Sequence, residues 1–207
     1  GMGTVRDVTV SNMFLKWIGG SIQNLSLDAN AQTGGTPTRF GNAIEAYGAA
    51  SNFTIKNSFC DQIYDCCFTV QNQEAVTFDN VHMYDNVARY SNTGLEVWQS
   101  GGITNNMHLH HNYTLFGGYG WSHQRPNKDG NFFYGGLGIR NTTFRNNSVD
   151  NNINILASNT ALLVSELGSA RYNFNNNIYV MGENKIYTNA PTNTEGYGTT
   201  GKIPYNY

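Results

Sequence analysis

The sequence of 207 residues has little charge, little proline and few cysteines. Charged residues make up 13% of it, about half of the roughly 25% that is usual for soluble domains. The net charge is −2 and no basic stripe is present, which argues against nucleic acid as a main partner. No apolar run is long enough to insert into a membrane. Cys60, Cys66 and Cys67 form an odd, clustered set, so we predict buried thiols rather than a disulfide framework.

The residues that are abundant are those of a turn-rich β protein. The sequence contains 23 glycines, and 39% of it is hydrophobic and 13% aromatic, which is not a disordered composition. Asparagine and threonine are also frequent. No segment shows the 3.6-residue apolar stripe of a helix over three turns. We therefore expect an all-β protein with little helix, and the length suits a single domain over residues 1–207.

A short strand with an asparagine inside it or just after it recurs along the chain. It reads IQNLSLD from Ile22, FTIKNSF from Phe53, VTFDNVHM from Val76, MHLHHNYTL from Met107, TTFRNNSV from Thr142 and YNFNNNIYV from Tyr172. A second strand alternates with it and reads AIEAYG from Ala43, CFTVQ from Cys67, GLEVWQ from Gly94, FFYGGLG from Phe132 and ALLVSE from Ala161. Two short strands per unit, repeated about six times, predict a β-solenoid.

The repeated asparagine has a physical role in such a fold. Equivalent positions of successive rungs lie about 4.8 Å apart, so their side chains stack. An asparagine amide both donates and accepts, and the residue tolerates the left-handed backbone region. We expect a ladder of Asn57, Asn80, Asn146 and Asn176, with Asn112 offset by one residue.

The repeated units, FTIKNSF and TTFRNN paired with AIEAYG and GLEVW, resemble those of the right-handed parallel β-helix family, the pectate-lyase-like superfamily. The resemblance covers roughly Val8 to Tyr187 and implies a right-handed parallel β-helix of about six rungs, with 188–207 as a tail or cap. It implies a carbohydrate-active protein, extracellular, periplasmic or on the cell surface. The superfamily includes lyases, hydrolases and non-catalytic adhesins, so the fold does not settle the activity.

The N-terminal helix that usually caps the first rung of this family is not seen before Val8. Either the chain is part of a longer solenoid or something else covers that end. An open end is an unpaired sheet edge, so we expect possible self-association through the ends.

The connectors between the first and second strands are expected along one edge of the solenoid. They span 29–42, 60–66, 84–93, 116–131 and 150–160. The longest, 29–42 and 116–131, lie three rungs apart, about 14 Å at normal strand spacing. We expect them to form the walls of a groove for an extended polymer.

The groove candidates have distinct expected roles. Tyr119, Trp121, Asp61 and Asp85 are predicted to bind substrate, and His123, Arg125 and Arg89 to act in catalysis. In a lyase, Arg125 or Arg89 would neutralise a uronate carboxylate and His123 or Tyr119 would take the proton. The alternative is a solvated loop that arginine hydrogen bonds hold in place.

The second strand predicts two further outward columns. If Ile44, Phe68, Leu95 and Leu163 point inward, the outward rows are Glu45, Thr69, Glu96, Val164 and then Tyr47, Gln71, Trp98, Glu166. Glu45 and Glu96 would lie about 9.6 Å apart, near the roughly 6.5–9.5 Å of an inverting glycosidase. Tyr47 and Trp98 could stack on sugar rings. The alternative for both glutamates is an ordinary solvent-facing position.

No metal or cofactor is expected, although two clusters contain residue types that bind metals. Asp61, Asp65 and Asp85 could bind calcium, but aspartate after a strand is ordinary turn chemistry. His108 and His110 of HLHH share a strand face, yet a zinc site needs three or four ligands and no third one is evident.

No catalytic motif of the known subfamilies is complete. The paired aspartates, Gly-His-Gly and Arg-x-Lys of the hydrolases are absent, and Arg125-Pro126 lacks the second arginine of the lyase motif. The sequence therefore leaves three hypotheses open. The chain acts on or binds an acidic polysaccharide as a lyase- or hydrolase-like protein. Alternatively it is a non-catalytic carbohydrate-binding or adhesin-type solenoid, or a structural piece whose active site lies elsewhere.

Overall fold

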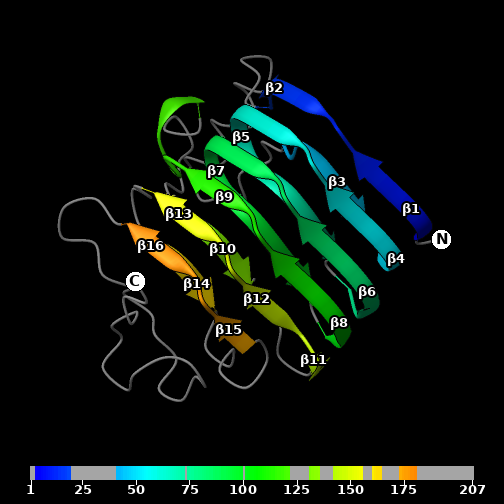
Figure 1. Ribbon diagram of the computed structural model, residues 1–207. Coiled ribbons are helices and arrows are strands. Elements are labelled where there is room, and N and C mark those ends of the chain that lie inside the picture. The colour runs from blue at the N-terminus through cyan, green and yellow to red at the C-terminus, as the bar shows by residue number, and fades with distance from the viewer. Residues whose placement is uncertain are drawn as a thin grey trace, which may run out of the picture.

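The computed structural model describes residues 3–19, 41–72, 74–99, 101–121, 131–135, 142–155, 160–164 and 173–180. Strands dominate this part of the chain, and only Gly120 and Trp121 are helical within it. Every strand pair formed by the described residues is parallel (Figure 1). No helix in these ranges is long and apolar enough to cross a membrane. The predicted all-β class with little helix is confirmed.

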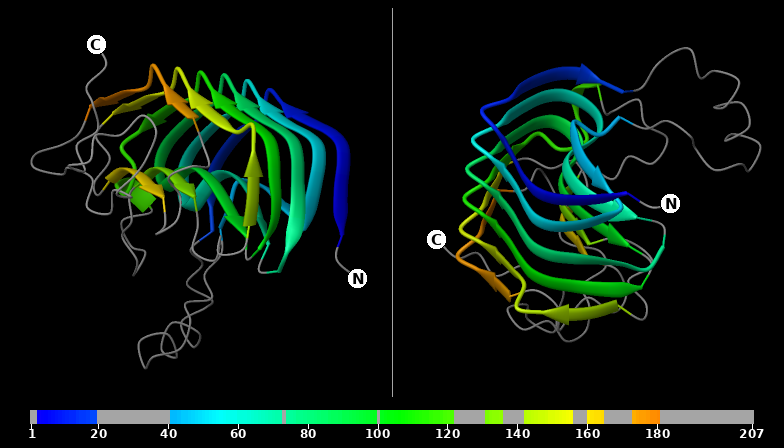
Figure 2. Two further views of the ribbon diagram at one scale, coloured as in Figure 1. Left: turned by 90° about the horizontal axis from the view of Figure 1, so that it is seen from below. Right: turned by 90° about the vertical axis from the view of Figure 1, so that its right-hand side faces the viewer.

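The strands form two sheets, and the chain passes alternately between them (Figure 2). The first sheet contains β1 (Thr4–Ser11), β4 (Ala49–Lys56), β6 (Val76–Tyr84), β8 (Gly102–His110), β12 (Ser148–Asp150) and β15 (Asn173–Asn175), with β11 (Thr142–Arg145) beside β8. The second contains β2 (Phe14–Ile18), β3 (Ile44–Tyr47), β5 (Phe59–Asn72), β7 (Val87–Gln99), β9 (Tyr113–Leu115), β10 (Asn131–Gly135), β13 (Ile153–Ile155), β14 (Thr160–Val164) and β16 (Ile178–Val180).

These strands include the predicted repeats that fall in the described residues, with two differences near the start of the chain. The strand predicted from Ile22 and the tail 188–207 lie outside the described residues. The chain enters the first sheet at Thr4, before the Val8 at which we expected the repeats to begin, and β2 was not predicted.

Three of the predicted connectors contain strands instead of loops: β13 lies within 150–160, and the other two are largely strand. Residues 60–66 lie inside β5, and 87–93 lie inside β7. Both strands bend without a loop, because Gln62 and Tyr90 take positive φ angles of 58° and 52°. The register of β5 against β7 also shifts by one residue between Ile63 and Cys66, which is a β-bulge. β5 and β7 therefore each serve both halves of the second sheet.

Inward-facing side chains from both sheets form one apolar core. In the first sheet they stack in register as Phe53, Val81 and Met107, and as Ile55, Met83, Leu109 and Val149. In the second sheet Phe68 packs level with Leu95. Each of these side chains is at most 2% exposed, so each contributes on the order of 1.5–3 kcal/mol through burial.

The three cysteines are buried free thiols, as predicted. Burial raises the pKa of the Cys66 thiol, and a hydrogen bond with Cys67 together with burial raises that of Cys60. The thiols of Cys60 and Cys66 are therefore protonated packing groups rather than nucleophiles.

A ladder of buried polar side chains, four asparagines and one serine, lies where the chain passes from the first sheet to the second. Its members are Ser58, Asn86, Asn112, Asn152 and Asn177, each at most 4% exposed. The Asn112 amide shows the pattern: its Nδ2 donates to Oδ1 of Asn152 at 3.0 Å and to the carbonyl of Met83 at 2.9 Å. The ladder thus supplies hydrogen bonds to buried polar groups at the corner.

The predicted ladder contained the wrong asparagines. Asn57 and Asn176 lie one residue before ladder positions, with φ angles of 48° and 53°. Asn80 lies at a bend inside β6 and Asn146 at a bend between β11 and β12, where φ is 54° and 51°. The repeat thus has more than one left-handed position that asparagine suits, and the sequence pattern merged them. Asn112, which the sequence placed one residue out of line, is a member of the buried ladder.

Candidate functional site

The outward face of β3, β5 and β7 brings together most of the predicted strand residues. Glu45 is in register with Thr69, and Thr69 with Glu96. Tyr47, Gln71 and Trp98 form a second column two residues further on. The inward positions Ile44, Phe68 and Leu95 also align as predicted. We call the two outward columns, Glu45–Thr69–Glu96 and Tyr47–Gln71–Trp98, the glutamate face.

One position of this alignment is corrected by the structure. The residue in line with Leu95, through Phe133, is Leu162 and not Leu163. Val164 accordingly aligns with Val97 rather than with Glu96. The error is one residue, and a one-residue slip moves every side chain of a strand to the opposite face.

Hydrogen bonds hold both carboxylates of the glutamate face. Gln71 Nε2 donates to Oε1 of Glu45 at 2.5 Å, and Asn42 Nδ2 donates to Oε2 of Glu45 at 3.1 Å. Thr69 Oγ1 donates to Oε1 of Glu96 at 3.1 Å. Glu45 is exposed and Glu96 is half-buried. The two acids lie two strands apart, about 9.6 Å at normal spacing, and their environments differ in exposure.

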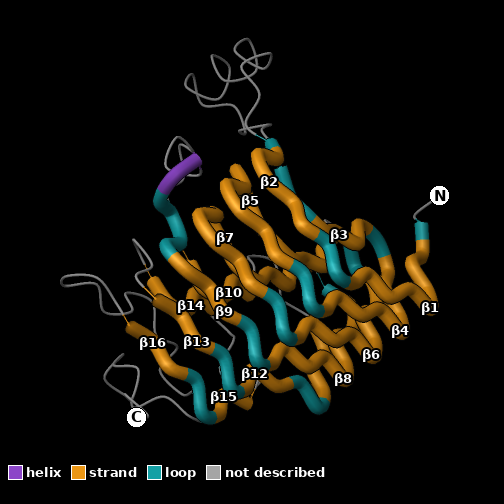
Figure 3. The backbone as a smooth tube through the Cα atoms, turned by 45° about the horizontal axis from the view of Figure 1, so that its top comes forward, coloured by secondary structure: helices purple, strands orange, loops and turns teal. Residues whose placement is uncertain are grey.

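The segment 116–121 crosses the bend of the second sheet, and we call it the strap. It leaves β9 at Phe116, and Gly118 N–H donates to the carbonyl of Ser91 in β7 at 2.7 Å. Gly120 then passes close to Tyr90 and Gln62, with a positive φ of 65°. The strap ends in a short helical turn at Trp121 (Figure 3, purple). It therefore runs from β9 over β7 and β5 towards β2.

Trp121 anchors the end of the strap to two segments that come earlier in the sequence. Its backbone N–H donates to Oε1 of Gln62 at 2.7 Å, and its indole Nε1 donates to the carbonyl of Gly19 at 3.1 Å. The ring meets Trp17 edge-on at 5.8 Å and Tyr64 edge-on at 6.3 Å between centroids. Tyr119, which we also predicted to bind substrate, is 43% exposed on the strap.

The strap brings the bases of the two longest connectors into contact. β2 and β9 are three steps apart in the order β2–β5–β7–β9, whereas the strand predicted before 29–42, from Ile22, lies outside the described residues. Trp121 nevertheless touches Gly19, so the separation of about 14 Å expected from strand spacing does not hold at the bases. Gly19 and Gly41 also pack backbone to backbone, since a Cβ on Gly41 would lie 2.5 Å from the Gly19 Cα.

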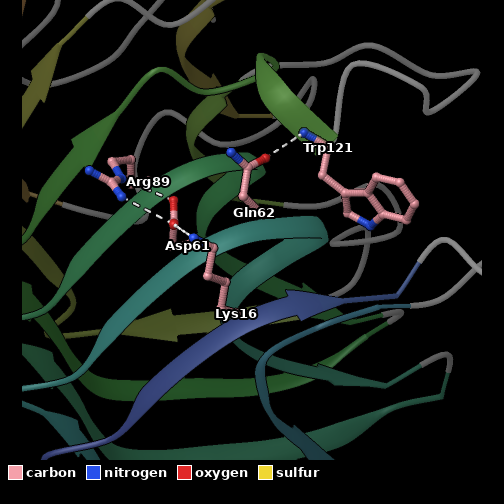
Figure 4. A network of polar contacts seen from close by, with 5 residues as sticks. All are labelled: Lys16, Asp61, Gln62, Arg89 and Trp121. Atoms are coloured by element: carbon pink, nitrogen blue, oxygen red, sulfur yellow. Dashed lines mark hydrogen bonds and ion pairs between the residues drawn. The ribbon is translucent and has the colours of Figure 1, made fainter.

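Asp61 and Arg89 form a close ion pair beside the strap (Figure 4). Arg89 Nε and Nη2 donate to the two carboxylate oxygens at 2.9 Å and 3.1 Å, and Lys16 Nζ lies 3.2 Å from Oδ2. Hydrogen bonds from Arg89, followed by those from Lys16, lower the pKa of Asp61 despite an opposing effect of burial. The same pair raises the pKa of Arg89. The three charges come from neighbouring strands, and the two cations leave the cluster with a net charge of +1.

The ion pair limits the roles predicted for Asp61 and Arg89. Two N–H groups of Arg89 are occupied by Asp61, so a uronate would have to bind its remaining donors or displace the aspartate. Asp61 is 2% exposed and faces two cations. In the part of the chain that the structure describes, no three His, Cys, Asp or Glu side chains are grouped to hold a metal ion.

The remaining predicted residues are dispersed or lie outside the described residues. Asp85 is at the corner between the two sheets, exposed, with a φ of 54° that marks a turn position. Asp65 is buried inside β5. His123 and Arg125 lie outside the described residues. Sequence reasoning missed Gln62, Lys16 and Trp17, which anchor the strap and the ion pair, because no repeat signal marks a contact across strands of different units.

Comparisons with family models, with curated proteins and with solved structures gave no match to this chain.

Proposed function

We propose that the two sheets are faces of a right-handed parallel β-helix of about six coils, and that the glutamate face binds an extended polysaccharide. The observation that carries the proposal is the register of Glu45, Thr69 and Glu96 beside Tyr47, Gln71 and Trp98. It repeats hydrogen-bonding and aromatic groups at the strand spacing across three strands. A polymer with regularly spaced rings and hydroxyls is the ligand that such a repeat matches.

The chemistry of the glutamate face favours a neutral polymer. Tyr47 is 55% exposed and Trp98 is half-buried, so both offer apolar ring surface to a sugar. Gln71 and the two carboxylates offer groups to sugar hydroxyls, whereas Thr69 is fully buried and holds the Glu96 carboxylate. β3, 66–72 and 94–99 contain no lysine or arginine that would attract an acidic chain. The acidic polymer expected from the sequence depended on Arg125 and on Arg89, and Arg89 is paired with Asp61.

The binding proposal is tested with affinity gels and calorimetry on a panel of neutral and uronate polysaccharides. We expect retardation by a neutral polymer, and at least tenfold weaker binding for Trp98→Ala and Tyr47→Ala. The matched control is Phe14→Ala, which removes an exposed ring, 68% accessible, from the other half of the second sheet. Equal losses in Phe14→Ala and Trp98→Ala would place the polymer elsewhere, and no binding by any polymer would end the proposal.

A second candidate is hydrolysis of that polymer with inversion. Two carboxylates on one face, about 9.6 Å apart by strand spacing, leave room for a sugar and a water between acid and base. Glu96, half-buried, suits the general acid, and Glu45, exposed, suits the base that activates water. The alternative remains a non-catalytic, adhesin-type binding protein.

Reducing-end assays separate hydrolysis from binding alone. We expect Glu96→Gln and Glu45→Gln to lower the rate at least a hundredfold while polymer binding is retained, and Glu74→Gln, an exposed acid outside the face, to have no effect. A wild-type protein that binds but releases no reducing ends is non-catalytic. Unsaturated products that disappear in His123→Ala and Arg125→Ala would instead support a lyase, and the same assay with added calcium tests a need for that ion.

A further inference from the structure

Four of the five histidines of the sequence gather on the outward face of the first sheet. His82 and His108 are in register on β6 and β8, between Thr54 on β4 and Ser148 on β12. His110 follows two residues after His108 and is in register with Tyr84. His111 lies at the adjoining corner. We call His82, His108, His110 and His111 with Tyr84 the histidine face.

The rings of the histidine face stack on each other along the sheet. Tyr84 and His110 lie parallel, with centroids 4.9 Å apart and planes 6° apart. His82 and His108 lie 5.2 Å apart with a tilt of 33°. Because each ring face is directed at the next strand, the rings present their edges to the solvent. The imidazole edges carry N–H groups, so this surface suits charged oxygen atoms better than flat apolar rings.

The charge of this face reverses when the histidines are protonated. The other charged side chains that project from its strands and corners are Arg6, Lys56 and Arg145 against Asp7, Asp79, Asp85 and Asp150. Acidic groups outnumber basic ones by one at neutral pH. Four imidazolium charges would make the face clearly positive. The half-buried rings border the buried core of the sheet, so their charges are screened less than those of fully exposed side chains.

We propose that the histidine face is a docking surface for a linear polyuronate, which it binds below about pH 6 and releases at neutral pH. The face is distinct from the glutamate face and lies on the other sheet, so the inference does not rest on the proposed function. Most uronate carboxylates are ionised at about pH 5, since ordinary carboxyl groups titrate at roughly 3.3–4.3. A window of mildly acidic pH therefore exists in which the polymer is anionic and the face cationic.

The local hydrogen bonds are consistent with this direction of switching. His110 Nδ1 and His111 Nδ1 lie 2.8 Å apart, a contact that requires one ring to accept and is lost when both are protonated. Burial, followed by the charge of His111, lowers the pKa of His110, and burial with the charge of His108 lowers that of His82. His82 and His110 thus resist protonation at neutral pH, and a polyanion would favour their protonation by supplying negative charge.

Nucleic acid fits this surface less well than a polyuronate. Single-stranded nucleic acids are bound largely by stacking of bases on exposed aromatic faces. Here the ring faces of Tyr84 and His110 are occupied by each other. Carboxylates spaced along a sugar chain can instead meet the imidazole edges, which lie one strand apart.

The test measures binding of polygalacturonate of defined length to the full chain at pH 5.0 and pH 7.5 at constant ionic strength. We expect at least tenfold tighter binding at pH 5.0, weakened by added salt. The triple variant H82Q/H108Q/H110Q is expected to lose this difference. The control Trp98→Ala, on the other sheet, is expected to keep it.

Several outcomes would overturn the proposal. These are equal affinity at both pH values, an unchanged pH dependence in the triple variant, or single-stranded DNA binding as tightly as polygalacturonate. Loss of polyuronate binding in Trp98→Ala but not in the histidine variant would assign this polymer to the glutamate face. If the triple variant does not fold, imidazole shifts in NMR spectra of the wild type, titrated with polygalacturonate at pH 5.0, decide the matter: unshifted rings of His82 and His108 reject the proposal.

Discussion

The indole Nε1 of Trp121 donates a hydrogen bond of 3.1 Å to the carbonyl oxygen of Gly19, 102 residues earlier in the chain. This contact joins the segment that follows β9 to the end of β2, three strands away in the second sheet. The strap therefore ties the segment after β9 to Gly19, which packs backbone to backbone against Gly41.

Trp121 is expected to be the main anchor of the strap. Trp121→Phe keeps a ring for Trp17 and Tyr64 but removes the indole N–H, so we expect a loss of about 1 kcal/mol in the free energy of unfolding. Trp121→Ala removes the ring contacts as well and should cost more. Urea denaturation measures both changes. Trp98→Phe, on the glutamate face and away from the strap, is the control, and an equal loss there would contradict a special role for Trp121.

Gly120 is required at the strap because two restrictions meet there. Its φ of 65° is unfavourable for residues with a side chain, and a Cβ would lie 2.5 Å from Gln62 Oε1 and 2.9 Å from Tyr90 Cβ. We expect Gly120→Ala to destabilise the protein by about 1–3 kcal/mol in thermal or urea unfolding. Gly3→Ala is the matched control, since a Cβ there meets nothing within 4 Å. A neutral Gly120→Ala would show that the strap is free to move.

The repeats made much of the architecture predictable from the sequence. Alternation of apolar residues in AIEAYG, CFTVQ and GLEVWQ was enough to place Glu45, Thr69 and Glu96 in one column, because a strand has a period of two and parallel neighbours stack in register. The same reasoning failed at Leu163, where the strand begins in a segment without a clear alternation and the register slipped by one.

The strap and the ladder were not predictable for different physical reasons. Contacts of Trp121 with Gln62 and Gly19 join residues that are not equivalent in the repeat, so no periodic signal marks them. The prediction of the ladder members failed because asparagine suits two neighbouring positions equally well. Asn57 occupies a left-handed bend just before the corner, and Asn86 occupies the buried amide column at the corner itself. Burial, which separates the two positions, is a property of the folded chain.

Asn112 is expected to be among the most sensitive positions of the ladder. Asn112→Ala would leave the Asn86 side-chain amide, the Asn86 backbone N–H and the Met83 carbonyl without this partner in a buried corner. We expect a loss of about 2–4 kcal/mol in the free energy of unfolding, measured with urea. The control is Asn146→Gly, which keeps a left-handed position but removes one exposed hydrogen bond to Asn106. A loss below that of the control would contradict a structural ladder.

The carboxylate of Asp61 is expected to make stability depend on pH. Hydrogen bonds from Arg89, then Lys16, lower its pKa in the folded protein below the ordinary value of 3.8, so the carboxylate stabilises the fold above pH 3.8 and this contribution is lost as the pH falls through the lower folded value. Asp61→Asn should therefore cost about 1–3 kcal/mol at pH 7, and the difference from wild type should shrink as the pH falls below the ordinary value of 3.8. Urea unfolding of both proteins across this pH range measures the difference in stability.

The control is Asp85→Asn, at an exposed corner that asparagine also suits, which should change stability by less than about 0.5 kcal/mol. A difference between wild type and Asp61→Asn that stays constant down to pH 2 would contradict the assigned ion pair.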